Sequence, residues 1–203
     1  MLVKKIELSQ KRELRIFQDD DSTSPREWDN MAKMFCSHKR YSLGDEHKYN
    51  SSDFSSWTEF KKQIEKDNDV AIILPLLLYD HSGISISTRY EYPYTDKWDS
   101  GQIGWVFITK DTIRKEYNVK HVTKSSLQKA LTYLLGEVEV YDQYLTGEVY
   151  SFDLVELEVC DCCGATKENT IDCCSGFFGS DFKKNGMLDN LDAGLKAEVE
   201  AKI

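Results

Sequence analysis

The stretch DVAIILPLLLYDHSGISISTRYEYPYTDKWDSGQIGWVFITK, residues 69–110, decides the fold, because it contains the longest uncharged apolar run of the chain. Residues 70–79 are apolar throughout, 84–88 alternate, and 103–108 are apolar on both faces. Turn residues separate these segments, so the pattern predicts three strands in meander order (70–109) that form a central, mainly antiparallel sheet. Pro75 cannot donate to a strand ladder, which predicts a bulge or an unpaired flank within the first strand.

Working outward, residues 2–8 and 14–17 resemble two short strands, and Ser24-Pro25-Arg26-Glu27 is a capping box that predicts a short helix carrying Met31 and Met34. Helical periodicity over 55–66, 111–117 and 125–145 predicts three further helices, and 148–159 has the period of a strand. These elements follow no regular βαβ order, which favours an α+β fold with helices packed on the sheet. We expect one domain over residues 1–203, with a cysteine-rich hairpin (160–179) and a C-terminal helical segment (181–203).

Composition excludes several classes of protein. The chain has 203 residues, 40% of them hydrophobic, and a net charge of −9, as expected of a folded globular protein. Its longest apolar run is about half of the roughly 18 residues needed to span a bilayer, and its N-terminus is too charged for a signal peptide. We therefore expect a cytoplasmic protein without membrane contact.

An acidic tract lies in the second half of the chain. No Lys or Arg occurs from 130 to 166, where the acids are Glu137, Glu139, Asp142, Glu148, Asp153, Glu156, Glu158 and Asp161. Such a field repels phosphate, so we expect no direct nucleic-acid binding. The tract predicts a surface for a basic partner or mimicry of a polyanion. The alternative is an ordinary acidic surface that aids solubility.

Aromatic residues crowd the segment RYEYPYTDKWDS, residues 89–100, between the second and third expected strands. Tyr92, Tyr94 and Trp98 would mark a protein interface if they are exposed. The alternative is that this loop folds back over the sheet as a lid.

Five of the six cysteines fall within fifteen residues, as Cys160, Cys162, Cys163, Cys173 and Cys174. Cys160 and Cys163 have the C-x-x-C spacing with which two thiolates reach one zinc ion from a tight turn. Adjacent residues of a strand point to opposite faces, so Cys173 and Cys174 would not share one ion. A zinc site would therefore use Cys160 or Cys162, with Cys163 and one of Cys173 or Cys174. The alternatives are reduced thiols that pack a hairpin, and a disulfide or redox role.

Residues of metal-binding or acid–base type also occur around the expected strand ends. Asp80, His81, Asp99 and Gly101 fall where strands end, and loop positions on a rigid sheet are where chemistry is usually mounted. If the loop of residues 36–50 covers that edge, His38, Asp45 and His47 would join them. His81 would then be a general base, oriented by Asp80 or Asp45. The alternative is that the histidines are hydrogen-bonded structural residues. No P-loop, G-x-G-x-x-G, G-x-S-x-G or kinase motif is present.

Six segments together resemble a family of uncharacterised proteins encoded by tailed bacteriophages and mobile elements. They are SPREWDN (24–30), CSHKRYSLGD (36–45), LYDHSGI (78–84), WDSGQIGWVFITK (98–110), RKEY (114–117) and YDQYLTGEVYSF (141–152). The resemblance covers about residues 14–190 and implies a phage origin and an accessory role. It implies no catalytic residue, since the family has no assigned activity. Where relatives have Cys-Trp-Gly, this chain has Cys174-Ser175-Gly176.

The sequence thus leads to three functional hypotheses. The first is a phage-type accessory protein that binds, and by analogy inhibits, a host defence protein through its acidic and aromatic surfaces. The second is a small hydrolase or nucleotide-processing enzyme, metal-dependent or not, built on the His/Asp cluster. The third is a structural module stabilised by zinc.

Overall fold

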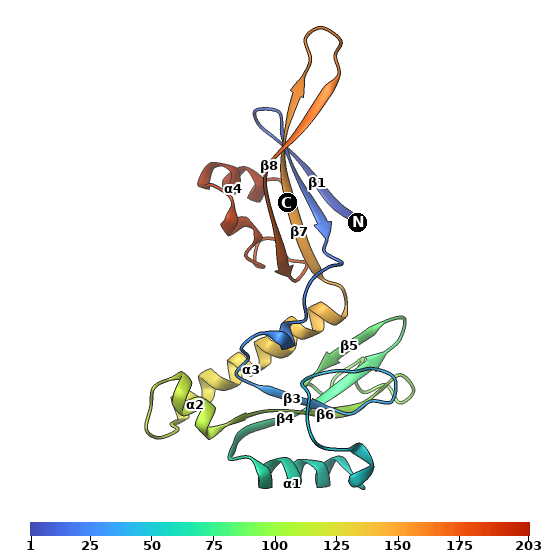
Figure 1. Cartoon of the computed structure of the whole chain (residues 1–203), viewed down its shortest axis with the longest axis vertical. Helices are drawn as coiled ribbons and strands as arrows, with labels where there is room; N and C mark the ends of the chain where they lie inside the picture. Colours follow the sequence, from blue (N-terminus) through green and yellow to red (C-terminus); the bar gives the residue numbers. More distant parts are fainter. The chain divides into compact units, whose positions relative to one another are not determined.

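The computed structural model describes residues 1–203, except for the side chain of Ser51, and has the α+β fold expected from the sequence. Its strands form two antiparallel sheets of four strands each (Figure 1). The chain divides into two compact units, named here for their places in the sequence: the middle unit, Ser24–Thr146, and the terminal unit, Met1–Thr23 with Gly147–Ile203. The domain predicted over residues 1–203 therefore contains two such units, each with a hydrophobic core of its own.

The middle unit contains the stretch that dominates the sequence. Its elements are η1 (Pro25–Glu27), β3 (Lys33–Cys36), η2 (Ser51–Asp53), α1 (Trp57–Asp67), β4 (Val70–Asp80), β5 (Ile84–Ser87), β6 (Ser100–Thr109), α2 (Lys110–Glu116) and α3 (Lys124–Leu145). The sheet order is β3-β6-β4-β5, and all neighbours are antiparallel.

The three strands predicted within 70–109 are present, but their meander order is wrong. In a meander β6 would pair with β5, whereas here it returns to the opposite edge of β4. The long β4 offers two edges, while β5 has only four residues, and the loop between β5 and β6 is long enough to cross over. Pro75 behaves as predicted: β5 pairs with β4 only from Leu77 onward, and the β4–β6 register shifts between Leu76 and Leu77.

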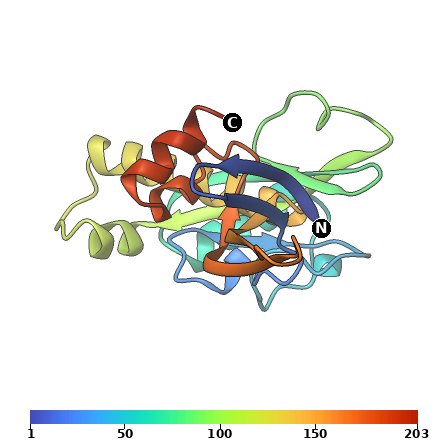
Figure 2. The same ribbon diagram turned by 90° about the horizontal axis from the view of Figure 1, so that it is seen from above.

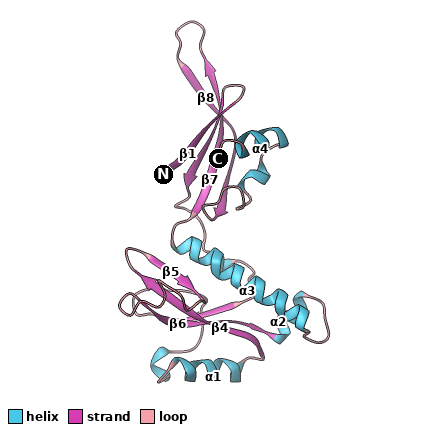
Figure 3. Cartoon of the chain, turned by 180° about the vertical axis from the view of Figure 1, so that it is seen from behind, coloured by secondary structure: helices cyan, strands magenta, loops and turns pink.

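Helices cover both faces of this sheet, which explains the continuous apolar runs of β4 and β6. Successive side chains of a strand point to opposite faces. Val106 and Ile108 accordingly pack with Leu134 of α3, whereas Phe107 packs with Ile64 of α1. Figure 3 shows α3 and α1 on opposite sides of β4 and β6. A strand buried on both faces has no polar side to display.

The helix predicted after Ser24 is much shorter than expected. The Ser24 hydroxyl caps η1 by accepting from the Arg26 N–H at 3.2 Å, but the helix ends at Glu27. Met34 belongs instead to β3, which pairs with β6 from Lys33 opposite Phe107. Tertiary pairing overrides the local pattern here. The other helices of the unit begin at predicted places, with Ser56 and Thr123 as the N-caps of α1 and α3.

The terminal unit joins the two ends of the chain in one sheet of order β1-β2-β7-β8. Its elements are β1 (Leu2–Leu8), β2 (Arg12–Gln18), β7 (Val149–Val159), β8 (Thr166–Phe178), η3 (Met187–Asn190) and α4 (Ala193–Glu200). Ile6, Leu14 and Phe152 bury one face of the sheet under Leu195 and Val199 of α4. This helix, red in Figure 1 and Figure 2, lies against the sheet in both views.

The opposite face of the terminal sheet carries an ionic network. The Glu13 carboxylate is buried and lies 2.5 Å from Lys5 Nζ and 2.7 Å from the Arg15 guanidinium. Arg15 also donates to both carboxylate oxygens of Glu168 at 2.7 Å. Burial opposes ionisation of Glu13, but the hydrogen bonds from Lys5 and Arg15 outweigh it and lower its pKa. The alternation of apolar and charged residues along β1 and β2 reflects this two-sided environment.

The predicted cysteine-rich hairpin (160–179) is the turn and return strand of a long β7–β8 ribbon. β2 pairs with β7 only as far as Glu156, whereas β7 and β8 remain paired out to Val159 and Thr166. Figure 1 shows this ribbon, in orange, extending past the ends of β1 and β2. The predicted C-terminal helical segment (181–203) contains η3 and α4. Among the residues that the structure describes, no helix has the length and apolar character needed to cross a bilayer.

Candidate functional site

The polar residues at the end of β4 do not form one cluster. Asp80 accepts hydrogen bonds from the Tyr41 hydroxyl at 3.1 and 3.2 Å and from the Arg40 guanidinium at 3.3 Å. The loop of residues 36–50 therefore does reach the strand end, as the sequence suggested. It uses Tyr41 and Arg40 to hold Asp80, rather than its histidines.

His81 has a different partner from the one expected. Its Nδ1 lies 2.9 Å from Oδ2 of Asp99, not beside Asp80 or Asp45, and its ring stacks on Tyr79 with centroids 5.9 Å apart. The physical reason is strand register: β6 pairs with β4, and the Asp80 N–H donates to the Asp99 carbonyl at 2.7 Å. Asp99 was identified as a strand-end residue, but its pairing with His81 needs the register. The two side chains are solvent-exposed, and they lie at the hydrogen-bond distance that an acid–base pair requires.

Asp45 is a structural residue. Arg26 donates to both of its carboxylate oxygens at 2.9 Å, and the Met34 N–H donates to it at 2.8 Å. The Arg26 side chain is only 5% exposed, and the Asp45 side chain is nearly buried as well. A carboxylate held by three donors is neutralised and positioned. It cannot orient His81, to which no contact connects it in the part of the chain that the structure describes.

Glu137 completes the same buried cluster and is not on a binding surface. Its carboxylate accepts from the N–H groups of Met31 at 2.7 Å and Ala32 at 3.1 Å, and lies 3.4 Å from Arg26. Burial raises the pKa of Glu137, although these hydrogen bonds and the Arg26 charge oppose the rise. We call Arg26, Asp45 and Glu137 the buried triad. It connects η1 and the 36–50 loop to α3.

The two histidines of the 36–50 loop also have structural partners. His47 Nε2 lies 2.8 Å from the Cys36 carbonyl oxygen, and its ring packs against Phe35 with centroids 4.9 Å apart. His38 Nδ1 accepts from the N–H groups of Arg40 and Tyr41 at 3.3 Å. The structure thus brings neither histidine to Asp80 or His81 as a ligand set. The alternative of hydrogen-bonded loop histidines describes them better.

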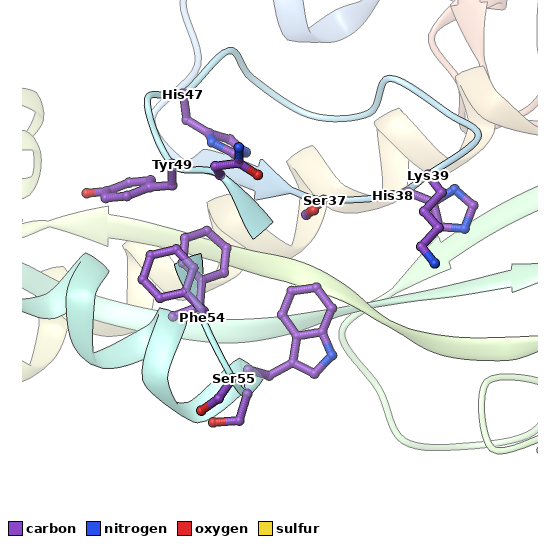
Figure 4. A pocket seen from close by; sticks show the side chains of 11 residues that line it. Ser37, His38, Lys39, His47, Tyr49, Phe54 and Ser55 are labelled. Atoms are coloured by element: carbon purple, nitrogen blue, oxygen red, sulfur yellow. The ribbon is translucent and has the colours of Figure 1, made fainter. Parts of the chain in front are cut away.

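A pocket of about 410 Å³ lies between this loop and the start of α1. Figure 4 shows Tyr49 and Phe54 on one side of it and His38 with Lys39 on the other. Its lining combines aromatic side chains with polar ones, as small-molecule pockets in general do.

Three aromatic side chains of the loop of residues 88–99 are exposed, and Tyr90, at 66%, is the least exposed of them. Trp98 is 93% exposed and Tyr92 is 81% exposed. The loop is nevertheless anchored: the Tyr94 hydroxyl lies 2.5 Å from Ser85 Oγ, and Asp96 Oδ1 accepts from the N–H groups of Trp98 and Asp99. These hydrogen bonds, from Asp99 and then Trp98, lower the pKa of Asp96. Tyr94 therefore supports the loop, and Tyr92 and Trp98 are presented to solvent.

Beside Trp98 lies a second pocket, of about 440 Å³, at the ends of β4 and β6. Its lining residues include Asp80 and Asp99 as well as Arg40 and His38. An indole next to two carboxylates suits a cationic side chain, because both attract positive charge.

The acidic tract is divided between the two units, and two of its acids are engaged inside the middle unit. Asp142 accepts from the Ile86 N–H at 2.7 Å, so it forms, like Glu137, a hydrogen bond inside the middle unit. Glu139 of the same unit is exposed. Glu148, Glu156 and Glu158 belong to the terminal unit. Glu156 lies 3.8 Å from Arg12, and Glu158 lies 3.9 Å from Lys167. Exposed pairs of this kind contribute little energy, but they do neutralise part of the tract.

Three cysteine thiols gather at the tip of the β7–β8 ribbon. The Sγ atoms of Cys160, Cys162 and Cys163 all lie within 4.8 Å of one another, and the group could hold a metal ion. The Gly164 N–H donates to the Cys160 carbonyl at 2.8 Å, which closes one tight turn around the three residues. Hydrogen bonding by Cys162, whose Sγ is 2.9 Å away, and by Cys163 lowers the pKa of Cys160 to about 7.

Cys173 and Cys174 lie elsewhere on the ribbon. They pair with Asp153 and Phe152, whereas the turn begins beyond Val159 opposite Thr166. Cys173 lies seven positions beyond Thr166 along the strand, or roughly 20 Å. As expected for a strand, the adjacent thiols differ in environment: Cys173 is exposed, while Cys174 packs against the core of the terminal unit. The structure therefore does not bring them to Cys160 and Cys163.

Comparisons with known proteins add no relative. No family model matches the chain, no curated protein matches it, and no solved structure matches it. The geometry of its own residues is therefore the guide to what this protein does.

Proposed function

We propose that this protein acts by binding another protein, with Trp98 and Tyr92 of the 88–99 loop as its anchors. The observation that carries the proposal is that Trp98 is 93% exposed while the base of its loop is held by Tyr94 and Asp96. An exposed aromatic side chain on an anchored loop loses little conformational freedom on binding, and Trp and Tyr are enriched among the residues that dominate interface energies.

The pocket beside Trp98 suggests the chemistry of the partner. Asp80 and Asp99 line it with Trp98, so these carboxylates and the indole would attract an Arg or Lys side chain of the partner, in competition with Arg40 for Asp80. We therefore propose a partner surface that combines apolar groups with at least one basic side chain. The net charge of −9 would also favour encounter with a basic surface.

For the identity of the partner we retain the expectation derived from the resemblance to phage accessory proteins. A host protein, for example one of a defence system, is the proposed partner, and inhibition is the proposed consequence. The acidic tract has a smaller part in this proposal than the sequence suggested, because Glu137 and Asp142 are engaged inside the middle unit.

The test is retention of host protein by three immobilised samples: the wild type, Trp98→Ala and Tyr133→Ala. Tyr133 is the matched control, because it is an exposed aromatic of α3 that lies outside the loop. We expect the wild type and the control to retain the same partner, and Trp98→Ala to weaken binding of the purified partner by about 2 kcal/mol, or roughly 30-fold in Kd. Circular dichroism verifies that all three samples are folded.

Two results would contradict the proposal. One is that the Trp98→Ala sample retains every protein that the wild type and the Tyr133→Ala control retain. The other is that the purified partner binds Trp98→Ala and the wild type with equal Kd.

A further inference from the structure

We propose that the turn at the tip of the β7–β8 ribbon binds a zinc ion through the thiolates of Cys160, Cys162 and Cys163, with the fourth coordination position open. The sequence predicts a site of Cys160 or Cys162, with Cys163 and one of Cys173 or Cys174. The set proposed here keeps both Cys160 and Cys162 and uses neither residue of β8. It is also independent of the protein-binding function proposed for the middle unit.

The geometry of the turn carries the proposal. Three Sγ atoms lie within 4.8 Å of one another, and Cys160 and Cys162 approach to 2.9 Å. Zinc–sulfur bonds of about 2.3 Å in a tetrahedron place sulfur atoms about 3.8 Å apart. The thiols therefore need to move by only about 1 Å, which exposed side chains can do by small rotations. Soft thiolate ligands of this kind select zinc or copper(I) over hard cations.

The backbone explains why adjacent cysteines can share an ion here but not in β8. The Cys160 N–H donates to the Ala165 carbonyl, and the Gly164 N–H donates back to the Cys160 carbonyl, both at 2.8 Å. Gly164 has φ +70°, a left-handed conformation that closes the turn and that other residues rarely adopt. Because the chain curls through Cys162 and Cys163, their side chains are not forced to opposite faces as they would be in a strand.

The open fourth coordination position follows from the residues that the structure places around the turn, which supply no further ligand. Within the described residues, no histidine, Asp or Glu joins the three thiols in a metal-binding group. Zinc sites that only stabilise a fold usually have four protein ligands, whereas three ligands leave a place for water or another molecule. We therefore infer a site whose fourth ligand is exchangeable, rather than a structural staple. On binding, each thiol releases its proton to solvent and gives a sulfur electron pair to the metal.

The location of the site supports the same conclusion. All three cysteines are exposed, and the ribbon beyond Glu156 extends past the last pairing of β7 with β2. The hydrophobic core of the terminal unit contains no residue of the turn. Metal removal should consequently leave the core packed.

The experiment uses the reduced full chain, prepared without metal, and titrates it with Zn²⁺ against a chromophoric chelator and with Co²⁺ as a spectroscopic probe. We expect one equivalent of metal, and a Co²⁺ spectrum with thiolate charge-transfer bands. Cys160→Ser and Cys163→Ser should each weaken Zn²⁺ binding by about 100-fold, because one of three thiolate bonds is lost. The double variant Cys173→Ser/Cys174→Ser is the matched control and should bind as the wild type does.

Three results would overturn the proposal. Zinc could bind the wild type no better than Cys160→Ser/Cys162→Ser/Cys163→Ser, the control could lose affinity as the tip variants do, or the Co²⁺ spectrum could lack thiolate bands. Thermal unfolding provides a further readout that distinguishes an exchangeable ion from a structural one. We expect the melting temperature of the reduced protein to change little on chelation, whereas a large decrease would assign the ion to fold stability. If the triple variant does not fold, the single variants still give the comparison.

Discussion

The sheet of the middle unit is packed between helices on both faces, whereas the sheet of the terminal unit is packed under α4 on one face and carries charged side chains on the other. In the first, β4 and β6 have no face on which to display polar groups. Its polar residues are therefore at strand ends and in loops, where Asp80, His81 and the 88–99 loop lie. In the second, the sheet itself has room for the network of Lys5, Glu13, Arg15 and Glu168.

This difference between the sheets also suits the two proposed sites, the protein-binding loop of the middle unit and the metal site of the terminal unit. A protein-binding loop depends on a rigid base, which the doubly covered sheet provides. An exchangeable metal site needs accessible ligands, which the two-stranded tip of the β7–β8 ribbon provides. The two sheets should therefore differ in which substitutions destabilise them.

The largest expected effect is on the buried triad of the middle unit. Arg26→Ala leaves the Asp45 and Glu137 carboxylates buried without their cation, and we expect it to reduce the free energy of unfolding by about 3–5 kcal/mol. Urea unfolding measures the loss, and hydrogen exchange by mass spectrometry locates it. Protection should fall within residues 24–146 and be retained in the terminal sheet.

Arg40→Ala is the control for this prediction. Arg40 also pairs with a carboxylate, Asp80, but it is 71% exposed, so its removal should cost less than about 1 kcal/mol. Equal losses for the two variants would show that burial of the triad has no energetic importance.

The next effect concerns the close approach of β3 and β6. A Cβ at Gly104 would collide with the carbonyl oxygen of Phe35 on β3, so Gly104→Ala should destabilise the protein by about 1–3 kcal/mol. Gly136 is the matched control, because it lies within α3 with no atom near its Cβ position. Gly136→Ala should stabilise by up to about 1 kcal/mol. Thermal unfolding of both variants gives the comparison, and shifts of the same sign would contradict it.

The smallest expected effect is on the terminal sheet, where the stabilisation by Glu13 should depend on pH. Glu13→Gln removes the charge that Lys5 and Arg15 share and should cost about 1–2 kcal/mol at pH 7. The pKa of Glu13 is lower in the folded protein than in the unfolded chain, where it is about 4.3. The ionised carboxylate therefore stabilises the fold fully above the unfolded pKa, and this stabilisation is lost as the pH falls through the folded pKa.

The measurement is the difference in melting temperature between the wild type and Glu13→Gln from pH 7 downward. It should be constant at first and then shrink below about pH 4. Glu7→Gln, on the adjacent strand, is the control and should differ from the wild type by no more than about 0.5 kcal/mol. A difference that grows on acidification would show that the sign of the Glu13 effect is wrong.

Local features of the sequence predicted local structure well. The apolar run of 70–79, the alternation of 2–8 and the amphipathic helix near 55–66 correspond to β4, β1 and α1. The prediction failed where the partner strand decides the outcome. Met34 has helical spacing with Met31 but lies in β3, because that segment pairs with β6. The sequence predicts a hairpin over 160–179 but not the length of β8, since its exposed residues show no apolar alternation and only pairing with β7 orders them.

For the candidate sites, the sequence identified residue types but not most partnerships. The exposed anchors Tyr92 and Trp98 and the thiols of Cys160 and Cys163 were identified from composition and spacing. The pairing of His81 with Asp99 depends on the β4–β6 register, which meander order would not have produced. Likewise, nothing in the local pattern shows that Glu137 and Asp45, far apart in the chain, would share Arg26.

By itself, therefore, the sequence determined which segments are apolar enough to form the two cores and where most helices begin. These properties follow from periodicity and capping within a few residues. The tertiary structure decided which charges are buried, which histidine has an acid–base partner and which thiols meet. Those outcomes depend on strand order and register, because a side chain acquires its partners from segments that the fold brings to it across long stretches of chain.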